Sequence, residues 1–184
     1  MNFLYVVLLL LSAALVGFVG LYNALVALRN QVGNAWQQIG VQLKRRHDLI
    51  PNLVEVVKDS MGYEQETLEK VIRARNQALQ ATGVRGTAAA EADLTGALRS
   101  LFAVVEAYPT LKANENVARL QEELTSTENR IAFARQFYND MVMRYNTRLQ
   151  VIPSNVIASL FNFKEEAYFE ITAAERDPVK VDLR

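Results

Sequence analysis

The sequence predicts an all-α fold in which an N-terminal single-pass transmembrane helix continues into an antiparallel four-helix up-and-down bundle. Three observations support this prediction. The 26 residues from Phe3 to Leu28 contain no charged side chain. Beyond Leu28, apolar residues recur at alternating spacings of three and four, as in helices that pack on one another. Only short loops separate these helical stretches, which favours up-and-down connections.

The composition excludes several classes of function. The chain has 184 residues, with 20 basic and 20 acidic side chains and no cysteine. Zero net charge argues against a nucleic-acid-binding protein, which needs basic residues to neutralise phosphates. Without cysteine there can be no disulfide, thiolate zinc site, iron–sulfur cluster or cysteine nucleophile. All the charged side chains follow Leu28, so the neutral average describes neither part of the chain.

Residues 1–28 are predicted to form a transmembrane anchor. An apolar helix of 26 residues is about 39 Å long, which exceeds the roughly 30 Å of a bilayer's hydrocarbon core. A cleaved signal peptide is the alternative. It is disfavoured because no Lys or Arg precedes the span and because the apolar run is longer than a usual signal-peptide core of about 7–15 residues.

The charges that flank the span predict its orientation. Arg29 and the cluster Lys44–Arg46 follow it, and the first acidic residue is Asp48. By the positive-inside rule, the bundle lies in the cytoplasm and the short N-terminus lies outside.

A heptad stripe predicts that the membrane helix continues directly into the first bundle helix. Nothing between Leu28 and the first stripe residue breaks a helix, and Pro51 inside the stripe predicts a kink at residues 47–51. Gly62 is expected to end the helix. The stripe is apolar except at Arg46 and consists of Val32, Trp36, Ile39, Leu43, Arg46, Ile50, Leu53 and Val57.

Three further helices are expected at residues 63–82, about 88–107 and about 114–150. Residues 83–87 read as a glycine-containing loop, with Thr87 as the N-cap of the third helix. Pro109 and Pro153 are expected to terminate the third and fourth helices. The stripe of the fourth helix contains one polar position, Thr127, with Glu128 beside it.

The charged stripe position predicts a structural polar layer. A buried unpaired charge costs several kcal/mol, so Arg46 needs an acid, which Glu128 or Glu122 of the fourth helix would supply next to Thr127. Such a layer would fix the register of the helices. The alternatives are an exposed Arg46 or a lipid-binding basic patch. Arg46 is about 27 Å beyond Leu28, too far for a lipid contact if the helix stands upright.

Residues near the membrane surface are candidates for interfacial contacts. The fourth helix should return its Tyr145–Asn146 pair to the level of Tyr22, Asn23 and Arg29, where tyrosines suit an interfacial belt. The alternative is that these tyrosines pack the lower bundle with wet hydroxyls.

The apolar stretch 156–163, which contains Phe161 and Phe163, lies at the same level. It either lies among lipid headgroups, caps the membrane end of the bundle, or packs on the core as a fifth short segment.

No catalytic or metal-binding motif is recognisable. His47 is the single histidine, so a surface or kink-adjacent position is favoured over a zinc site. No Glu-x-x-His pair suggests a di-iron centre, and there is no phosphate-binding loop or nucleophile elbow. We therefore expect no cofactor and no enzymatic activity.

Several motifs resemble the LemA family over about residues 20–165. The resemblance implies a single-pass bacterial inner-membrane protein with a helical bundle at residues 29–165, and no established activity, cofactor or partner. Residues 166–184 form the expected C-terminal tail, partly disordered. The motifs include Tyr22-Asn23-Ala24-Leu25-Val26, Ala35-Trp36, Gln42-Leu43-Lys44-Arg45-Arg46, Asp48-Leu49-Ile50-Pro51-Asn52-Leu53-Val54, Leu101-Phe102-Ala103, Glu106-Ala107-Tyr108-Pro109, Thr127-Glu128 and Ala134-Arg135.

Two functions remain open. The favoured one is a membrane-anchored scaffold or interaction protein, self-associating, with membrane lipid and other membrane proteins as partners. The alternative is a membrane-tethered sensor or ligand-binding accessory module that uses the polar layer around Arg46.

Overall fold

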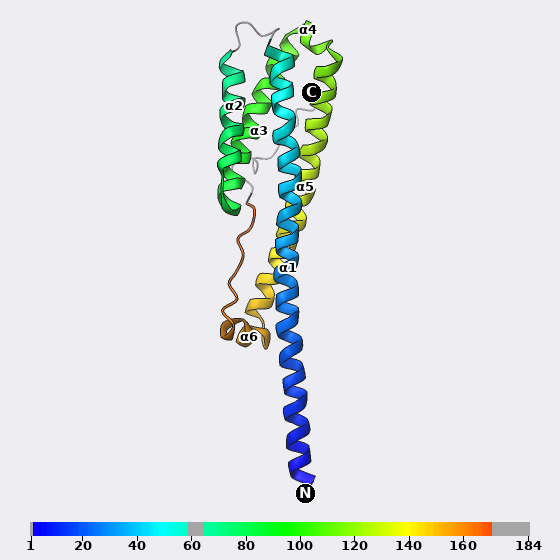
Figure 1. Cartoon of the computed structure of the whole chain (residues 1–184), viewed down its shortest axis with the longest axis vertical. Helices are drawn as coiled ribbons and strands as arrows, with labels where there is room; N and C mark the ends of the chain where they lie inside the picture. Colours follow the sequence, from blue (N-terminus) through cyan, green and yellow to red (C-terminus); the bar gives the residue numbers. More distant parts are fainter. Residues whose placement is uncertain (1, 59–64, 171–184) are drawn as a thin grey trace, which may run out of the picture. The chain divides into compact units, whose positions relative to one another are not determined.

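The computed structural model describes residues 2–58 and 65–170, and all regular secondary structure in these two ranges is helical. The all-α prediction is therefore confirmed for the described residues. Within residues 2–58 and 65–170 the helices, labelled in Figure 1, are α1 (Asn2–Lys58), α2 (Gln65–Gln80), α3 (Gly83–Ala107), α4 (Pro109–Lys112), α5 (Glu115–Gln150) and α6 (Ser154–Leu160).

Helix α1 contains both the apolar run and the first heptad stripe. It is 57 residues long and continues without interruption through Leu28 and through Pro51. Its most apolar 18-residue window has a mean hydropathy of 2.6, and none of that window is buried. By length and composition, α1 can cross a membrane. The expected continuation of the apolar run into the next helical stretch is confirmed.

Some helix boundaries differ from those expected. The loop predicted at residues 83–87 is wrong, because α3 already begins at Gly83. Gly83 has a φ of +71°, which glycine adopts without strain, so Ala81 and Thr82 suffice to link α2 to α3. Thr87 is consequently buried inside α3 and is not an N-cap.

The expected ends of the third and fourth helices agree with the structure. Helix α3 ends at Ala107, just before Pro109, and α5 ends at Gln150. The side-chain Oδ1 atom of Asn114 accepts hydrogen bonds from the backbone N–H groups of Asn116 and Val117, at 2.9 and 3.3 Å, and so caps α5. Gly62, which we expected to end the first helix, lies outside the described residues.

The chain divides into two compact units. The first unit comprises Met1–Gln38 and Gln136–Ala167. Its core includes Trp36 and Tyr138, whose ring centroids are 5.6 Å apart, and the Tyr138 hydroxyl donates a 2.8 Å hydrogen bond to the carbonyl of Ala167. Asn146 uses both ends of its amide to bind the backbone N–H and carbonyl of Glu166. These bonds hold residues 166–167 beside α5.

The second unit comprises Ile39–Arg135 and Tyr168–Arg184. Helices α2 and α3 pack on each other. One apolar core receives residues from α1, α2, α3, α4 and α5, among them Leu53, Val71, Leu101, Leu111 and Val117. Of the tail predicted at residues 166–184, Phe169 is buried, and residues 171–184 lie outside the described residues.

A polar contact compensates for the proline inside α1. Proline has no backbone N–H, so the carbonyl of His47, four residues before Pro51, loses its helical partner. The Nε atom of Arg75 in α2 donates a 2.8 Å hydrogen bond to this carbonyl. Because an unpaired buried carbonyl costs about 1–3 kcal/mol, this bond makes Pro51 tolerable within a helix.

We predict that the substitution Leu101→Ala destabilises the protein by about 2–5 kcal/mol, because Leu101 is fully buried and its truncation leaves a cavity. Chemical denaturation followed by circular dichroism measures the change. Leu79→Ala is the matched control, since Leu79 is 53% exposed and its truncation should cost much less. Equal losses for the two variants would contradict the assignment of the core.

Candidate functional site

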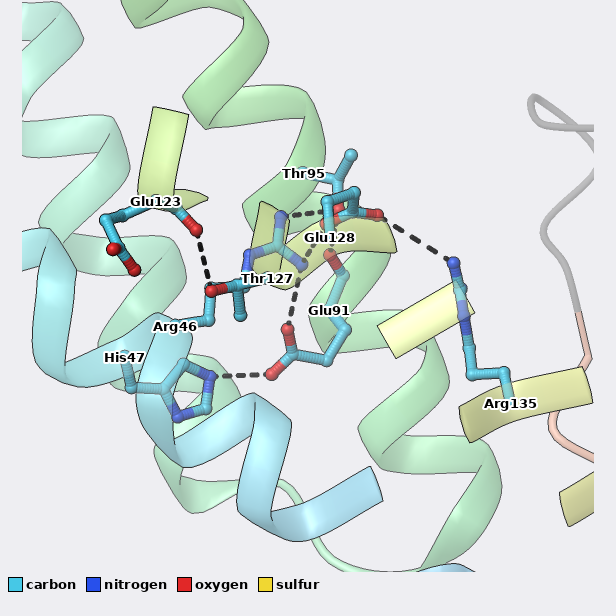
Figure 2. A network of polar contacts seen from close by, with 8 residues as sticks. All are labelled: Arg46, His47, Glu91, Thr95, Glu123, Thr127, Glu128 and Arg135. Carbon is cyan, nitrogen blue, oxygen red and sulfur yellow. Dashed lines mark hydrogen bonds and ion pairs between the residues drawn. The ribbon is translucent and has the colours of Figure 1, made fainter. Parts of the chain in front are cut away.

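The most distinctive site in the second unit is a buried charge network centred on Arg46. Only 3% of Arg46 is exposed. Its Nη1 atom lies 3.3 Å from Oε2 of Glu91 in α3 and 3.1 Å from Oε2 of Glu128 in α5 (Figure 2). Its Nη2 atom donates a 2.8 Å hydrogen bond to the Thr95 hydroxyl. Three helices therefore meet at one guanidinium group.

Glu91 links this arginine to the single histidine. The Oε1 atom of Glu91 lies 2.6 Å from Nε2 of His47, and both side chains are buried. A carboxylate only accepts hydrogen bonds, so Nε2 of His47 is the donor. Of the two positions predicted for His47, on the surface or adjacent to the expected kink, the surface position is wrong, because the side chain is buried and points at Glu91 in Figure 2.

The network balances its own charge. The Nη2 atom of Arg135 lies 3.9 Å from Oε1 of Glu128, so two guanidinium groups face two carboxylates. Burying an ion is costly unless an opposite charge and hydrogen bonds compensate it, and this arrangement provides both. The formal charges of Arg46, Arg135, Glu91 and Glu128 therefore sum to zero.

The other predicted members of the polar layer lie at different places. Thr127 is buried, and its hydroxyl donates a 2.7 Å hydrogen bond to the backbone carbonyl of Glu123 within α5. Glu122 is exposed and does not contact Arg46, so its proposed pairing is not what the structure shows. Among the three residues expected around Arg46, the structure brings Glu128 into direct contact with it.

Exposed ion pairs surround the network. Arg45 donates to Glu123, and Lys44 donates to Asp48 at 2.6 Å. The Lys44 hydrogen bond holds the pKa of the Asp48 carboxyl below its usual value of 3.8. Solvent-exposed pairs of this kind contribute little to stability, so the buried contacts of Arg46 dominate the site.

Sequence reasoning missed Glu91, although the sequence contains a signal for it. Glu91 is a charged residue within the buried face of α3, which is otherwise formed by Thr87, Leu94, Leu98, Leu101 and Val105 at spacings of three and four. Glu91 lies within the helix predicted at about residues 88–107, but its place on the buried face of that helix was not recognised.

A pocket of about 240 Å³ opens onto the network. Its lining includes Arg46 and Glu128 of the network together with the apolar side chains of Leu98, Phe102 and Leu124. The full lining comprises Arg46, Thr95, Leu98, Arg99, Phe102, Leu124, Thr125 and Glu128. Its volume is slightly below the usual range of about 300–1,000 Å³ for small-molecule sites.

Four of the six membrane-interface candidates cluster in the first unit. The ring of Tyr22 lies 4.7 Å from that of Phe161 and 5.9 Å from that of Phe163, and the guanidinium of Arg29 lies 5.5 Å from the Phe163 ring centre. Asn23 is exposed one residue along α1. The sequence thus predicted which side chains gather here, although not their contacts.

Tyr145 differs from the expectation of an interfacial or wet tyrosine. It is fully buried, and its hydroxyl is enclosed without a hydrogen-bond partner among the described residues. Burial is the main cause of the raised pKa of Tyr145, and the charge of Glu166 adds to it. Burial and Glu166 likewise raise the pKa of Tyr138 to about 12, so both phenols are neutral at physiological pH.

No group of three or more His, Asp or Glu side chains in residues 2–58 and 65–170 is arranged to hold a metal ion.

Comparison with known proteins identifies the family. The model of the LemA family matches residues 35–183. The chain belongs to the LemA family. The matched region contains the whole charge network and α6, and it begins after the bare apolar part of α1.

Named proteins from several bacteria are similar to this LemA-family chain. Magnetosome protein MamQ 2 of Paramagnetospirillum magneticum is 24% identical, over 86% of this chain and 68% of the relative. Protein LemA of Metamycoplasma hominis is 26% identical, over 86% and 73% of the two chains. Magnetosome protein MamQ of Magnetospirillum gryphiswaldense is 24% identical, over 86% and 68%.

We predict that Glu91→Ala destabilises this LemA-family protein by about 3 kcal/mol or more. The substitution removes the acidic partner of Arg46 in α3 and leaves the His47 ring buried without its acceptor. Chemical denaturation followed by circular dichroism measures the loss. The control is Glu122→Ala, which removes an exposed carboxylate and should change stability by about 0.5 kcal/mol or less. A Glu91→Ala variant as stable as the control would show that the network is not structural.

Proposed function

We propose that this LemA-family protein is a single-pass protein of the bacterial inner membrane, with a cytoplasmic helical domain that self-associates and organises partners. In this proposal, residues 1–28 form the anchor and residues 29–165 form an antiparallel up-and-down bundle. The partners are membrane lipid, further copies of the chain and other membrane proteins. The protein has no catalytic activity and needs no cofactor.

The observation that carries the proposal is the bare apolar surface of α1. Large side chains such as Leu9, Leu15 and Val16 are 64% to 72% exposed, because no other part of the described chain covers them. Water-exposed apolar area costs roughly 25 cal/mol per Å², so this surface requires an apolar environment, which a bilayer provides. A core helix of a water-soluble protein would instead be covered by its own chain. The unbroken continuation of α1 to Lys58 supports a retained anchor.

Short connections support the up-and-down arrangement of the bundle. Two residues, Ala81 and Thr82, link α2 to α3, and Ala113 and Asn114 link α4 to α5. Short links favour antiparallel neighbours.

Two features support scaffolding over catalysis. The acidic and basic side chains of the charge network pair with one another, as expected of a polar layer that fixes the register of the helices. Exposed apolar side chains in the second unit, among them Val41, Ile72 and Phe133, offer area for contacts with other chains. Anchoring to a membrane also confines encounters to two dimensions, so weak contacts suffice for assembly.

A second candidate function is a membrane-tethered sensor. The observation that favours it is the pocket beside Arg46, where Arg99 and Thr125 could bind a small polar group against the apolar wall of Leu98 and Phe102. The sensor hypothesis predicts a monomeric protein.

Cysteine labelling tests the anchor and its orientation, because the chain has no cysteine of its own. We predict that Ser100→Cys, at an exposed position of α3, is protected from a membrane-impermeant maleimide in intact cells and is labelled after permeabilisation. Labelling in intact cells would show that the helical domain lies outside the cytoplasm. Recovery of the protein in the soluble fraction would refute the membrane anchor.

Native mass spectrometry of the full chain in detergent tests self-association. We predict masses that are multiples of the 20.7 kDa chain, with matching cross-linked species in the membrane before extraction. A purely monomeric protein in both experiments would contradict the scaffold and favour the sensor.

A further inference from the structure

Helix α6 has apolar side chains on its exposed side as well as on its buried side, with Ser154 among the buried residues and Ser159 among the exposed ones. Ser154, Ile157 and Ala158 are buried against the first unit, whereas Val156 and Leu160, one turn apart on another face, are 64% and 68% exposed. A helix that faces water normally presents polar side chains on its outer face. The outer face of α6 is therefore built for an apolar environment.

The apolar exposure extends beyond the helix on both sides. Ile152 before α6 is 84% exposed, and Phe161 after it is 48% exposed. The 15 residues from Leu149 to Phe163 include no charged side chain. We call the exposed side chains Ile152, Val156, Leu160 and Phe161 the α6 face. Exposed apolar side chains grouped in this way mark interaction surfaces.

The α6 face lies beside the inner end of the apolar run of α1. The Phe161 ring lies 6.0 Å from that of Phe18 and 4.7 Å from that of Tyr22. Both partners lie in the last part of the uncharged span, close to Arg29, and Figure 1 shows α6 alongside this part of α1. The two apolar surfaces are therefore neighbours within one unit.

The end of α6 fixes this placement. Asn162 adopts a left-handed conformation with φ of 55°. The N–H of Asn162 then bonds the carbonyl of Ser159, and the N–H of Phe163 bonds that of Ala158 at 2.9 Å. This pattern is a Schellman motif, which ends the helix and reverses the chain. It directs Phe163 back toward Tyr22 and Arg29, so the aromatic contacts follow from a defined helix end.

Basic side chains border the uncharged segment. Arg148 precedes it, Lys164 follows it, and Arg29 lies over the Phe163 ring. The acidic Glu165 that comes next is engaged by the side-chain amide of Gln150 at 2.7 Å. An apolar face with aromatic and basic residues at its edge matches the layering of a bilayer, from acyl chains through the interface to anionic headgroups.

We propose that α6 is a second membrane-contacting element, whose exposed face inserts into the cytoplasmic interfacial layer of the same bilayer that α1 crosses. The proposal rests on the anchoring role proposed for α1. We assign lipid as the partner of the α6 face because this face continues the apolar surface of α1, which no other part of the described chain covers. Insertion of an apolar helix face by about 5–10 Å is the usual depth of interfacial helices.

Spin labelling of the full chain tests the proposal. Single-cysteine variants Ile152→Cys and Leu160→Cys report on α6, Leu10→Cys reports on the span, and Leu79→Cys in α2 is an exposed apolar control. Each labelled protein is reconstituted in vesicles of phosphatidylethanolamine and phosphatidylglycerol. Collision with oxygen, which concentrates in lipid, and with a water-soluble nickel chelate is then measured.

We expect the labels at residues 152 and 160 to gain oxygen accessibility and to lose nickel accessibility relative to the label at residue 79. The label at residue 10 should be the deepest. Labels on α6 that match residue 79, with residue 10 deep, would overturn this proposal and leave the anchor intact. Labels on α6 shielded from both reagents would mean that protein covers the face, which also overturns it. An aqueous residue 10 would refute the anchor itself.

Discussion

An arginine removed from water imposes the strictest condition on this protein. Arg46 in α1 requires opposite charge, and Glu91 from α3 and Glu128 from α5 supply it at 3.3 and 3.1 Å. A shift of any of the three helices by one residue would leave an ion buried without its partner, at a cost of several kcal/mol. Apolar side chains tolerate such slippage better, because their attraction is not directional. The ion pairs therefore define which apolar residues can meet in the surrounding core.

The contacts of Arg46 also show which parts of the site can be predicted from the sequence. The heptad stripe indicated that Arg46 is buried, and burial implied an acid, which allowed Glu128 to be named. Glu91 lies within the helix predicted at about residues 88–107, but a single glutamate beside an apolar stripe does not by itself show that its side chain is buried. The start of α3 was also missed, because it depends on one backbone angle, that of Gly83. A glycine beside a threonine reads as a loop, and only the three-dimensional path shows that the chain turns and continues directly as α3.

In the apolar part of the chain, too, some structural features could be predicted from the sequence and others could not. Absence of charge predicted the long helix, because hydrocarbon penalises every charged side chain regardless of its neighbours. The gathering of Tyr22, Phe161 and Phe163 followed from the expected return of the chain. The burial of Tyr145 did not, because a stripe position does not reveal whether a hydroxyl is enclosed or solvated. Periodicity identifies the inward face of a helix, but the surroundings of one atom depend on every neighbour.

The proline within α1 couples two helices energetically. Pro51 leaves the carbonyl of His47 without its helical donor, and Arg75 of α2 donates a hydrogen bond to it. With any other residue at position 51, the backbone N–H of that residue could bond the same carbonyl beside Arg75, because a carbonyl oxygen accepts two hydrogen bonds. Loss of the Arg75 side chain therefore leaves the carbonyl unsatisfied only while residue 51 is a proline. The cost of substituting Arg75 depends in this way on a residue of another helix.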